Sequence, residues 1–290
     1  GMGCIIMKVN FATVCMNVSQ NKEINLQKFL KYIDEAADNG ANLIVFPEQS
    51  LQGYLTNVCA MDMSNSELNE FHIQYKNAET VPLGNSVQRI TKKAIERKIY
   101  VVFGMTEKDS DVDYKLYNTA VLVGPNGYIG KYRKVHQPVD ECHVYYSGKK
   151  FPVFQTDIGR IGMLICYDKW LPESTRELAL AGADILIMPT ATAFTDPVKK
   201  DHNTDYAYYT YDLMDRVRAL ENQTFFISAN QTGICGNSTY FGYSNIIAPT
   251  GKVAATTADK EGIAYYTTED MYSEIYYAKN CFAGCNFLKD

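Results

Sequence analysis

Residues 160–173, RIGMLICYDKWLPE, decide the fold that this chain is expected to adopt. The run that ends at Cys166 is short, apolar and contains β-branched residues, which is typical of a buried strand. Pro172 and Glu173 then suit the first turn of a helix, because proline has no N–H to leave unsatisfied there and an acid complements the helix dipole. Cys166 is therefore predicted to lie on a strand-to-helix elbow.

A thiol on such an elbow is a candidate nucleophile. Rigid elements hold it, it can project from the edge of the sheet, and the main-chain N–H groups of Tyr167 and Asp168 follow closely enough to bind an oxyanion. The alternative interpretation is a buried core thiol, which is the usual role of a free cysteine. This stretch alone leaves both interpretations open.

The composition favours one soluble domain that acts on a small molecule. A chain of 290 residues with 46% hydrophobic content can bury one large core. The net charge is −5 and the basic residues are scattered, so neither nucleic acid nor an anionic membrane is an expected partner. No stretch approaches the roughly 20 consecutive apolar residues of a transmembrane helix, and no secretory leader is recognised. We therefore expect a cytoplasmic protein.

The cysteines predict neither a disulfide scaffold nor a metal site. Eight cysteines are too sparse for a disulfide framework in a chain of this length, so they are expected to be reduced. Cys281 and Cys285 form a C-x3-C pattern that lacks a second ligand pair. Cys142-His143, with His136 upstream, is also a weak metal candidate. We predict no metal and no cofactor.

The remaining pattern mixes βα units with hairpins, which favours an α/β fold with mixed sheets. Asn25 is a candidate N-cap for the first helix, and Gly40 is placed to end it. The predicted helices cover 26–37, 83–95, 174–180 and 205–221, with a short helix within 62–77. The predicted strands cover 5–14, 43–46, 100–105, 117–123, 128–132, 160–166, 185–188, 225–229, 241–247 and 262–266. The aromatic tail 269–290 shows no clear period and is a candidate for contact with a partner subunit.

Two charged residues next to predicted strands are candidates for catalysis. Glu48 follows the apolar run 43–46, where desolvation would raise its pKa and suit it as a general base. Lys134 ends a basic segment that comes directly off a strand, and an ammonium beside a thiol can lower the thiol's pKa and hold an oxyanion. A solvated loop acid and a solvated basic face are the alternatives.

Three short blocks, in this order, resemble the signature blocks of the nitrilase superfamily of carbon–nitrogen hydrolases. They are residues 46–48 (FPE), 132–136 (YRKVH) and 165–168 (ICYD). The resemblance extends over the chain apart from the tail 269–290, through Arg176 and the segments 181–184, 189–191, 218–222, 228–230 and 244–251. It implies a four-layer α-β-β-α sandwich with two mixed β-sheets, formed by residues 1–290 as a single domain.

The resemblance also implies a Glu-Lys-Cys triad, which by position is Glu48, Lys134 and Cys166, with Glu141 as a second glutamate. Cys166 would attack an amide carbonyl, while Lys134 and the Tyr167 N–H would stabilise the oxyanion. Glu48 would move the protons and activate the water that hydrolyses the thioester. Glu141 would orient Lys134 or the substrate.

Some neighbouring residues receive no catalytic role in this interpretation. Lys131 and Arg133 would be ordinary cations at a strand end, and His136 would be structural. A Cys-His pair that uses His136 with Cys166 remains an alternative.

The elbow favours a small linear amide or an N-carbamoyl compound as substrate, with release of ammonia. Tyr167-Asp168 after the nucleophile resembles the pattern of amidases, whereas true nitrilases commonly have Trp-Glu there. Residues 166–173 are also similar to the elbow of N-carbamoylputrescine amidases, from which Tyr167 and Lys169 depart. The candidates for the substrate pocket, each of which could instead be core, are Tyr54, Tyr167, Trp170, Thr190, Ala191 and Phe194.

Three other functions stay open at this point. The chain could be a nitrilase that acts on a nitrile, a glutaminase subunit that supplies ammonia to a partner synthetase, or an inactive binding or scaffold homologue. The intact combination of Glu48, Lys134 and Cys166 argues against a scaffold, because binding alone does not need it. The family resemblance further implies a homodimer or a higher homo-oligomer, with the elbow helices at the interface.

Overall fold

The computed structural model describes residues 5–53, 70–138, 141–282 and 284–289. Its centre consists of two six-stranded sheets with the strand orders β14-β1-β2-β3-β4-β5 and β13-β12-β9-β8-β7-β6. The first sheet comprises β1 (Val9–Cys15), β2 (Leu43–Val45), β3 (Tyr100–Lys108), β4 (Leu116–Gly124), β5 (Gly127–Arg133) and β14 (Gly262–Thr268). The second comprises β6 (Val153–Thr156), β7 (Gly159–Met163), β8 (Ile185–Pro189), β9 (Phe225–Ala229), β12 (Asn245–Ile247) and β13 (Val253–Thr256).

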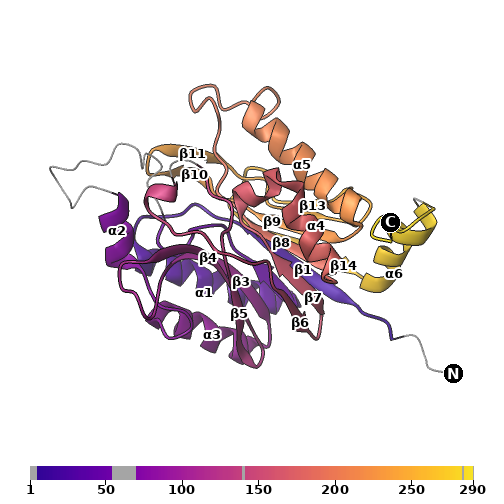
Figure 1. Ribbon diagram of the computed structural model, residues 1–290, viewed down its shortest axis with the longest axis horizontal. Helices are drawn as coiled ribbons and strands as arrows, with labels where there is room; N and C mark the ends of the chain where they lie inside the picture. Colours follow the sequence, from indigo (N-terminus) through magenta and orange to yellow (C-terminus); the bar gives the residue numbers. More distant parts are fainter. Residues whose placement is uncertain (1–4, 54–69, 139–140, 283, 290) are drawn as a thin grey trace.

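Helices cover the outer faces of both sheets, which completes the four layers (Figure 1). On the first sheet lie α1 (Lys22–Asp38) and α3 (Asn85–Arg97), and on the second lie α4 (Pro172–Leu180) and α5 (Tyr206–Asn222). The other elements are α2 (Glu70–Asn77), α6 (Met271–Tyr276), the π-helix η5 (Tyr277–Phe282), the hairpin β10 (Thr232–Cys235) and β11 (Ser238–Phe241), and the short 3-10 helices η3 (Glu141–His143) and η4 (Cys166–Trp170).

Both sheets are mixed, as predicted. Parallel pairs join β1 to β2 and β2 to β3 in the first sheet, and β7 to β8 and β8 to β9 in the second. The outer pairs are antiparallel, including β3 with β4 and β6 with β7. Carboxyl ends of parallel strands meet at one edge of a sheet, so β2 and β7 each deliver the residues that follow them to such an edge.

Apolar side chains from the two inner faces interlock to form the central core. Phe11 of β1 meets Phe225 of β9 with their ring centroids 5.3 Å apart, and Ile161 and Ile187 belong to the same buried cluster. Close packing of this kind fixes the separation of the two sheets. The core therefore sets the distance between any side chain at the end of β2 and any side chain at the end of β7.

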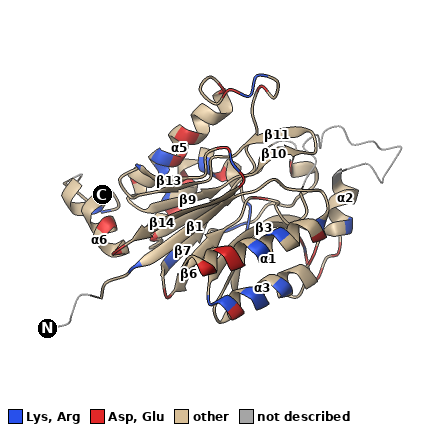
Figure 2. Ribbon diagram, turned by 180° about the vertical axis from the view of Figure 1, so that it is seen from behind, with Lys and Arg blue, Asp and Glu red and all other residues tan. Residues whose placement is uncertain are grey.

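Charged residues of both signs lie on the outer helices, as Figure 2 shows for α1 and α3. Asp34 of α1 accepts from Lys93 and Arg97 of α3, each at 2.9 Å. Surface pairs of this type contribute little individually, about 1 kcal/mol or less. None of the helices in the described part of the chain has the length and apolar run needed to cross a membrane.

The predicted N-cap of the first helix is wrong. Helix α1 begins at Lys22, and the cap is Asn21, whose side chain accepts a hydrogen bond from the Ile24 N–H at 3.2 Å. Asn25 lies one turn inside the helix, fully buried, and its amide donates to the carbonyls of Ser19 at 2.6 Å and Leu51 at 3.0 Å. Two asparagines four residues apart offer the same local cap signal, and the tertiary contacts of Asn25 decide between them.

The single strand predicted over 241–247 is two strands. Strand β11 ends at Phe241 and β12 begins at Asn245, because Gly242 and Tyr243 adopt positive φ angles of 76° and 59°. The Asn230 side chain accounts for the break, since its amide donates to the Gly242 carbonyl at 2.8 Å. The apolar run continues through the break, so periodicity alone does not reveal it.

Other element boundaries also differ from the predictions. The first strand begins at Val9 rather than at residue 5, and the strand before the elbow ends at Met163. The tail, for which no period was found, contains α6 and η5 within its described part.

Gly104 of β3 lies directly beneath the segment that carries Glu48. A Cβ atom at this position would be 2.6 Å from the Pro47 carbonyl oxygen and 2.7 Å from the Glu48 Cα. Gly104→Ala is therefore expected to lower the free energy of unfolding by about 1–3 kcal/mol and to displace Glu48. Chemical denaturation measures the first effect, with Lys92→Ala on the exposed face of α3 as the control. Unchanged stability in Gly104→Ala would show that the close approach is absent.

Candidate active site

Cys166 occupies the predicted elbow, and its backbone is in a conformation rare for side-chain-bearing residues. It has a φ of 46° and begins η4, which leads through Leu171 into Pro172 at the start of α4. Positive φ costs a non-glycine residue on the order of 1 kcal/mol, so surrounding contacts must hold it in place. This geometry projects the half-buried thiol away from the end of β7.

The buried carboxylate of Asp168 holds the elbow. It accepts hydrogen bonds from the Ile165 N–H at 2.9 Å, the His136 N–H at 2.9 Å and the Tyr132 hydroxyl at 2.5 Å. These donors come from both sheets, because Tyr132 lies on β5 and Ile165 follows β7. The Asp168 N–H donates to the Ile165 carbonyl at 3.0 Å, so the expectation that it binds an oxyanion is wrong, and Tyr167 remains as the elbow donor for that role.

Three buried charged groups meet beside the thiol. Lys134, directly after β5, is 1% exposed, and its ammonium lies 2.8 Å from Glu48 Oε2 and 2.8 Å from Glu141 Oε2. Glu141 Oε1 lies 3.0 Å from the same nitrogen, so both of its oxygens bind Lys134. The structure thus brings together the four residues that the sequence singled out for catalysis.

Asn118 of β4 joins this cluster and was missed by the sequence reasoning. Its fully buried side-chain amide donates to Glu48 Oε2 at 2.7 Å and is 3.5 Å from Glu141 Oε2. The available signal was a lone amide in an otherwise apolar strand, since a buried polar side chain requires a partner.

Glu48 keeps one oxygen uncommitted. Its Oε1 is buried and has no hydrogen-bond partner among the described residues, whereas Oε2 accepts from Asn118 and Lys134. The backbone of Glu48 is fixed by its N–H, which donates to the Thr190 carbonyl at 3.2 Å, and by its carbonyl, which accepts from the Gln231 amide at 3.0 Å. An anchored carboxylate with one unpaired oxygen can take up a proton.

The pKa shifts indicate a charged lysine and a protonated thiol. Burial lowers the pKa of Lys134, but Glu141 and Glu48 outweigh it and the net shift is upward. Burial, followed by the charge of Glu48, raises the pKa of Cys166 to about 11, against opposing contributions from Lys134 and Thr190. Burial also raises the pKa of Glu141. A thiol with such a pKa is neutral at pH 7 and needs a base to become a nucleophile.

A pocket of about 340 Å³ opens beside Cys166 and Glu141. Among the residues predicted for its wall, Tyr167, Trp170 and Ala191 line it. Tyr54 lies outside the described residues. The other lining residues are Pro138, Lys169, Thr192, Ala193, Thr195, Tyr206, Ala207, Thr210 and Tyr211, which come from four separate segments.

Two predicted wall residues lie behind the pocket and do not line it. Thr190 is fully buried, and its hydroxyl is 2.8 Å from that of Thr192. Thr192 takes the place at the wall, with its hydroxyl 3.9 Å from Cys166 Sγ. Phe194 packs edge-on against Phe241, with ring centroids 5.7 Å apart. Ala191, Thr192, Ala193 and Thr195 all line the pocket, so this segment does not alternate as a strand would, and its residue pattern could not show which side chains face the site.

His136 supports the elbow through its contacts with Asp168 and Ser174. Its ring Nδ1 is 3.0 Å from Asp168 Oδ1 and 3.3 Å from the Ser174 hydroxyl, and the hydrogen bond to Asp168 raises its pKa. These contacts favour the structural role over a pair with Cys166. The described residues contain no group of three or more His, Cys, Asp or Glu side chains placed to hold a metal ion.

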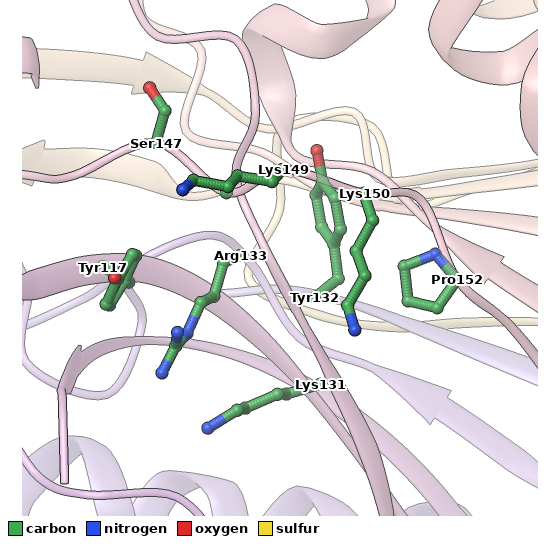
Figure 3. Close-up of a pocket in the computed structure, with 9 residues that line it drawn as sticks. Tyr117, Lys131, Tyr132, Arg133, Ser147, Lys149, Lys150 and Pro152 are labelled. Carbon is green, nitrogen blue, oxygen red and sulfur yellow. The ribbon is translucent and has the colours of Figure 1, made fainter. Parts of the chain in front are cut away.

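A larger pocket of about 480 Å³ lies along β5 and the segment 147–152 (Figure 3). Lys131, Arg133, Lys149 and Lys150 give it a basic lining. Lys131 and Arg133 both bind the buried Glu107, at 2.5 Å and 2.9 Å, as expected of cations at a strand end with a structural role. None of Glu48, Lys134, Glu141 and Cys166 lines this pocket, so volume alone does not identify the candidate site.

Glu48→Gln is expected to lower the pKa of Cys166, because the negative charge of Glu48 disfavours the thiolate. The measurement is the pH dependence of iodoacetamide labelling at Cys166, followed by peptide mass spectrometry. The wild-type midpoint should lie at about 11 and the midpoint of the variant below it. Glu177→Gln on the exposed side of α4 should behave as the wild type. An equal or higher midpoint in Glu48→Gln would contradict the proximity of the two groups.

Comparisons with known proteins agree with this geometry. The family model described as carbon-nitrogen hydrolase matches residues 10–275. A probable nitrilase, C965.09, of Schizosaccharomyces pombe is 34% identical over 269 residues, covering 91% of this chain and 89% of that protein. An omega-amidase, NIT2, of Xenopus tropicalis is 30% identical, covering 88% and 87%.

Solved structures show the same fold. Nit3 of Saccharomyces cerevisiae, a member of the nitrilase superfamily, has a TM-score of 0.77 at 26% identity and covers 97% of this chain and 98% of its own. An amidase from Nesterenkonia sp. has a TM-score of 0.73 at 21% identity, covering 100% and 95%. The family match, the relatives and the buried cluster beside an elbow cysteine lead to one conclusion: this chain belongs to the carbon–nitrogen hydrolases of the nitrilase superfamily.

Proposed function

We propose that this chain hydrolyses a small linear amide or N-carbamoyl compound through a thioester on Cys166, with release of ammonia. The observation that carries the proposal is the Lys134 ammonium, buried between Glu48 and Glu141 beside a thiol whose pKa is raised. A buried ammonium is stable there because two carboxylates surround it, and a developing oxyanion can use the same positive charge.

The first half of the reaction forms the thioester. Glu48 Oε1 accepts the proton of the Cys166 thiol, and the thiolate sulfur attacks the carbonyl carbon of the substrate. Lys134 and the Tyr167 N–H stabilise the negative charge on the carbonyl oxygen. The intermediate then collapses, the carbon–nitrogen bond breaks, and Glu48 returns the proton to the departing ammonia.

The second half removes the acyl group. Glu48 takes a proton from a water molecule, whose oxygen attacks the thioester carbon, and the second oxyanion occupies the same place as the first. Breakage of the carbon–sulfur bond releases the acid, and the proton held by Glu48 restores the Cys166 thiol. Glu141 takes part in neither proton transfer, and its two oxygens hold Lys134 in position.

The amide class is supported by the residues that follow the nucleophile in the elbow. Tyr167-Asp168 follows the nucleophile, and the buried Asp168 is integral to the elbow through its three donors. The relatives include proteins named as nitrilases and as omega-amidases, so their names do not decide between a nitrile and an amide. A substrate panel makes this distinction directly.

Cys166→Ala is expected to lower turnover by about 10⁴-fold or more, because it removes the nucleophile. Ammonia release is measured on small amides, N-carbamoyl amines, N-carbamoyl amino acids and nitriles, and circular dichroism checks that the fold is retained. Cys281→Ala, at an exposed position in the tail, is the matched control. Activity of Cys166→Ala equal to the wild type would refute the proposal, and hydrolysis restricted to nitriles would replace the amide class.

We also propose that the chain forms a homodimer through the helices next to the elbow. Leu180 of α4, Leu213 and Leu220 of α5 and Tyr276 of α6 are 63%, 39%, 40% and 61% exposed. Figure 1 places α4 and α5 over the second sheet, with α6 at the end of the sandwich. Clusters of exposed apolar side chains mark interaction surfaces in soluble proteins.

Leu180→Arg is expected to weaken this dimer, since it introduces a charge into an apolar interface. Sedimentation velocity should show a dimer for the wild type and a larger monomer fraction for the variant. Val198→Arg is the control, because Val198 is 91% exposed and lies in a loop before α5. A wild-type monomer would contradict the proposal.

A further inference from the structure

The pocket beside Cys166 presents mainly aromatic and small side chains. Tyr167, Trp170 and Tyr206 are 37%, 40% and 66% exposed, so their rings are available for contact with a ligand. A volume of about 340 Å³ is at the small end of the range of pockets that bind small molecules. In the described part of its lining, the charged residues are Glu141 and Lys169.

Both of these charges are already paired within the protein. Glu141 uses its two oxygens on Lys134. The Lys169 side chain is 3% exposed, and its ammonium lies 3.0 Å from Asp215 Oδ1 and 4.0 Å from the centre of the Tyr211 ring. The carboxylate and the aromatic face compensate the charge of this buried ammonium, which has no hydrogen-bond partner among the described residues. The described lining therefore offers no unpaired charge to the remote end of a substrate.

Asp215 lies behind the pocket wall on α5 and does not line the pocket. It is fully buried, and apart from Lys169 its carboxylate oxygens have no partner among the described residues. The neighbouring cation Arg218 is engaged elsewhere, since it donates to the Lys169 carbonyl at 2.9 Å and to Glu221 Oε1 at 3.1 Å. Lys169 and Asp215 thus depend on each other for charge neutrality.

We propose that Asp215 determines substrate specificity: by neutralising Lys169, it makes the pocket select substrates whose remote end is uncharged. This proposal rests on the proposed amide hydrolysis. A carboxylate at the remote end would lose its water without gaining an unpaired cation from the described lining, because Asp215 neutralises Lys169. An ammonium at the remote end would lose its water without gaining an unpaired carboxylate there, because Glu141 binds Lys134. An alkyl or aryl end has no such cost and packs on Tyr167, Trp170 and Tyr206.

Three amides of matched length test the wild type: pentanamide, the monoamide of glutaric acid, and 5-aminopentanamide. At pH 8 the expected kcat/KM for pentanamide is about tenfold or more above that of either charged amide, because a charged end would be left unpaired. The Kd of each compound for Cys166→Ala protein provides a readout that does not need turnover. Equal or tighter binding of a charged amide, or no binding of pentanamide, overturns the proposal.

Variants of the ion pair test the role of Asp215. Asp215→Asn removes the partner of Lys169 and should raise kcat/KM for the glutaric monoamide relative to pentanamide by about tenfold. Lys169→Met leaves Asp215 without its cation and should instead favour 5-aminopentanamide, and it decides the question if Asp215→Asn does not fold. Asp212→Asn is the matched control, because Asp212 lies on the same helix and pairs with Arg216. An unchanged ratio of kcat/KM for the charged amides to kcat/KM for pentanamide, in a folded variant of the pair, overturns the proposal. If the wild type hydrolyses none of the three amides, amide hydrolysis itself is refuted.

Discussion

The buried ammonium of Lys134 is the group on which the site depends. It lies 2.8 Å from a carboxylate of Glu48 and 2.8 Å from one of Glu141, and removal of one partner from a buried ion pair typically costs about 3–5 kcal/mol. Glu48 follows β2 and Lys134 follows β5, so the first sheet supplies both, while η3 supplies Glu141. Elements of the first sheet and η3 therefore meet at this cluster, and its ammonium is the group that would stabilise an oxyanion.

The second sheet brings the thiol to this cluster through a strained turn. The positive φ of Cys166 persists because the Asp168 carboxylate accepts hydrogen bonds from segments of both sheets. The donors include the Tyr132 hydroxyl of β5 and the Ile165 N–H after β7. Lys134 is two residues beyond Tyr132, so a single short segment fixes both the elbow and the ammonium. Relative motion of the two sheets would disturb both contacts at once, so the candidate active site depends on the interface between the layers.

Short-range patterns of the sequence predicted the mixed sheets and pointed to Glu48, Lys134 and Cys166, whereas the layer order and Glu141 came from the resemblance to the family. Strands such as β8 and β9 are apolar runs, and Glu48, Lys134 and Cys166 lie in short motifs next to strands. The predictions that failed concern features that depend on contacts between distant segments. Asn21 and Asn25 give the same cap signal, and the break after Phe241 depends on Asn230. Thr190 is fully buried, whereas Thr192 lines the pocket, because the segment after β8 does not alternate as a strand would. Asn118 and Asp215 act through partners far away in sequence.

The two charged clusters that border the pocket differ in their balance of charge. At the reacting end, one ammonium faces two carboxylates, and burial raises the pKa of Glu141, which lessens the excess of negative charge. At the remote end, Lys169 faces the single carboxylate of Asp215. The proposed base, Glu48, thus lies at the end where the thiol would be activated, while the other end offers aromatic surface and an ion pair without net charge. This asymmetry would orient an amide with its carbonyl toward Cys166 and its uncharged end toward Trp170, since the reverse orientation would leave polar groups of both partners unpaired.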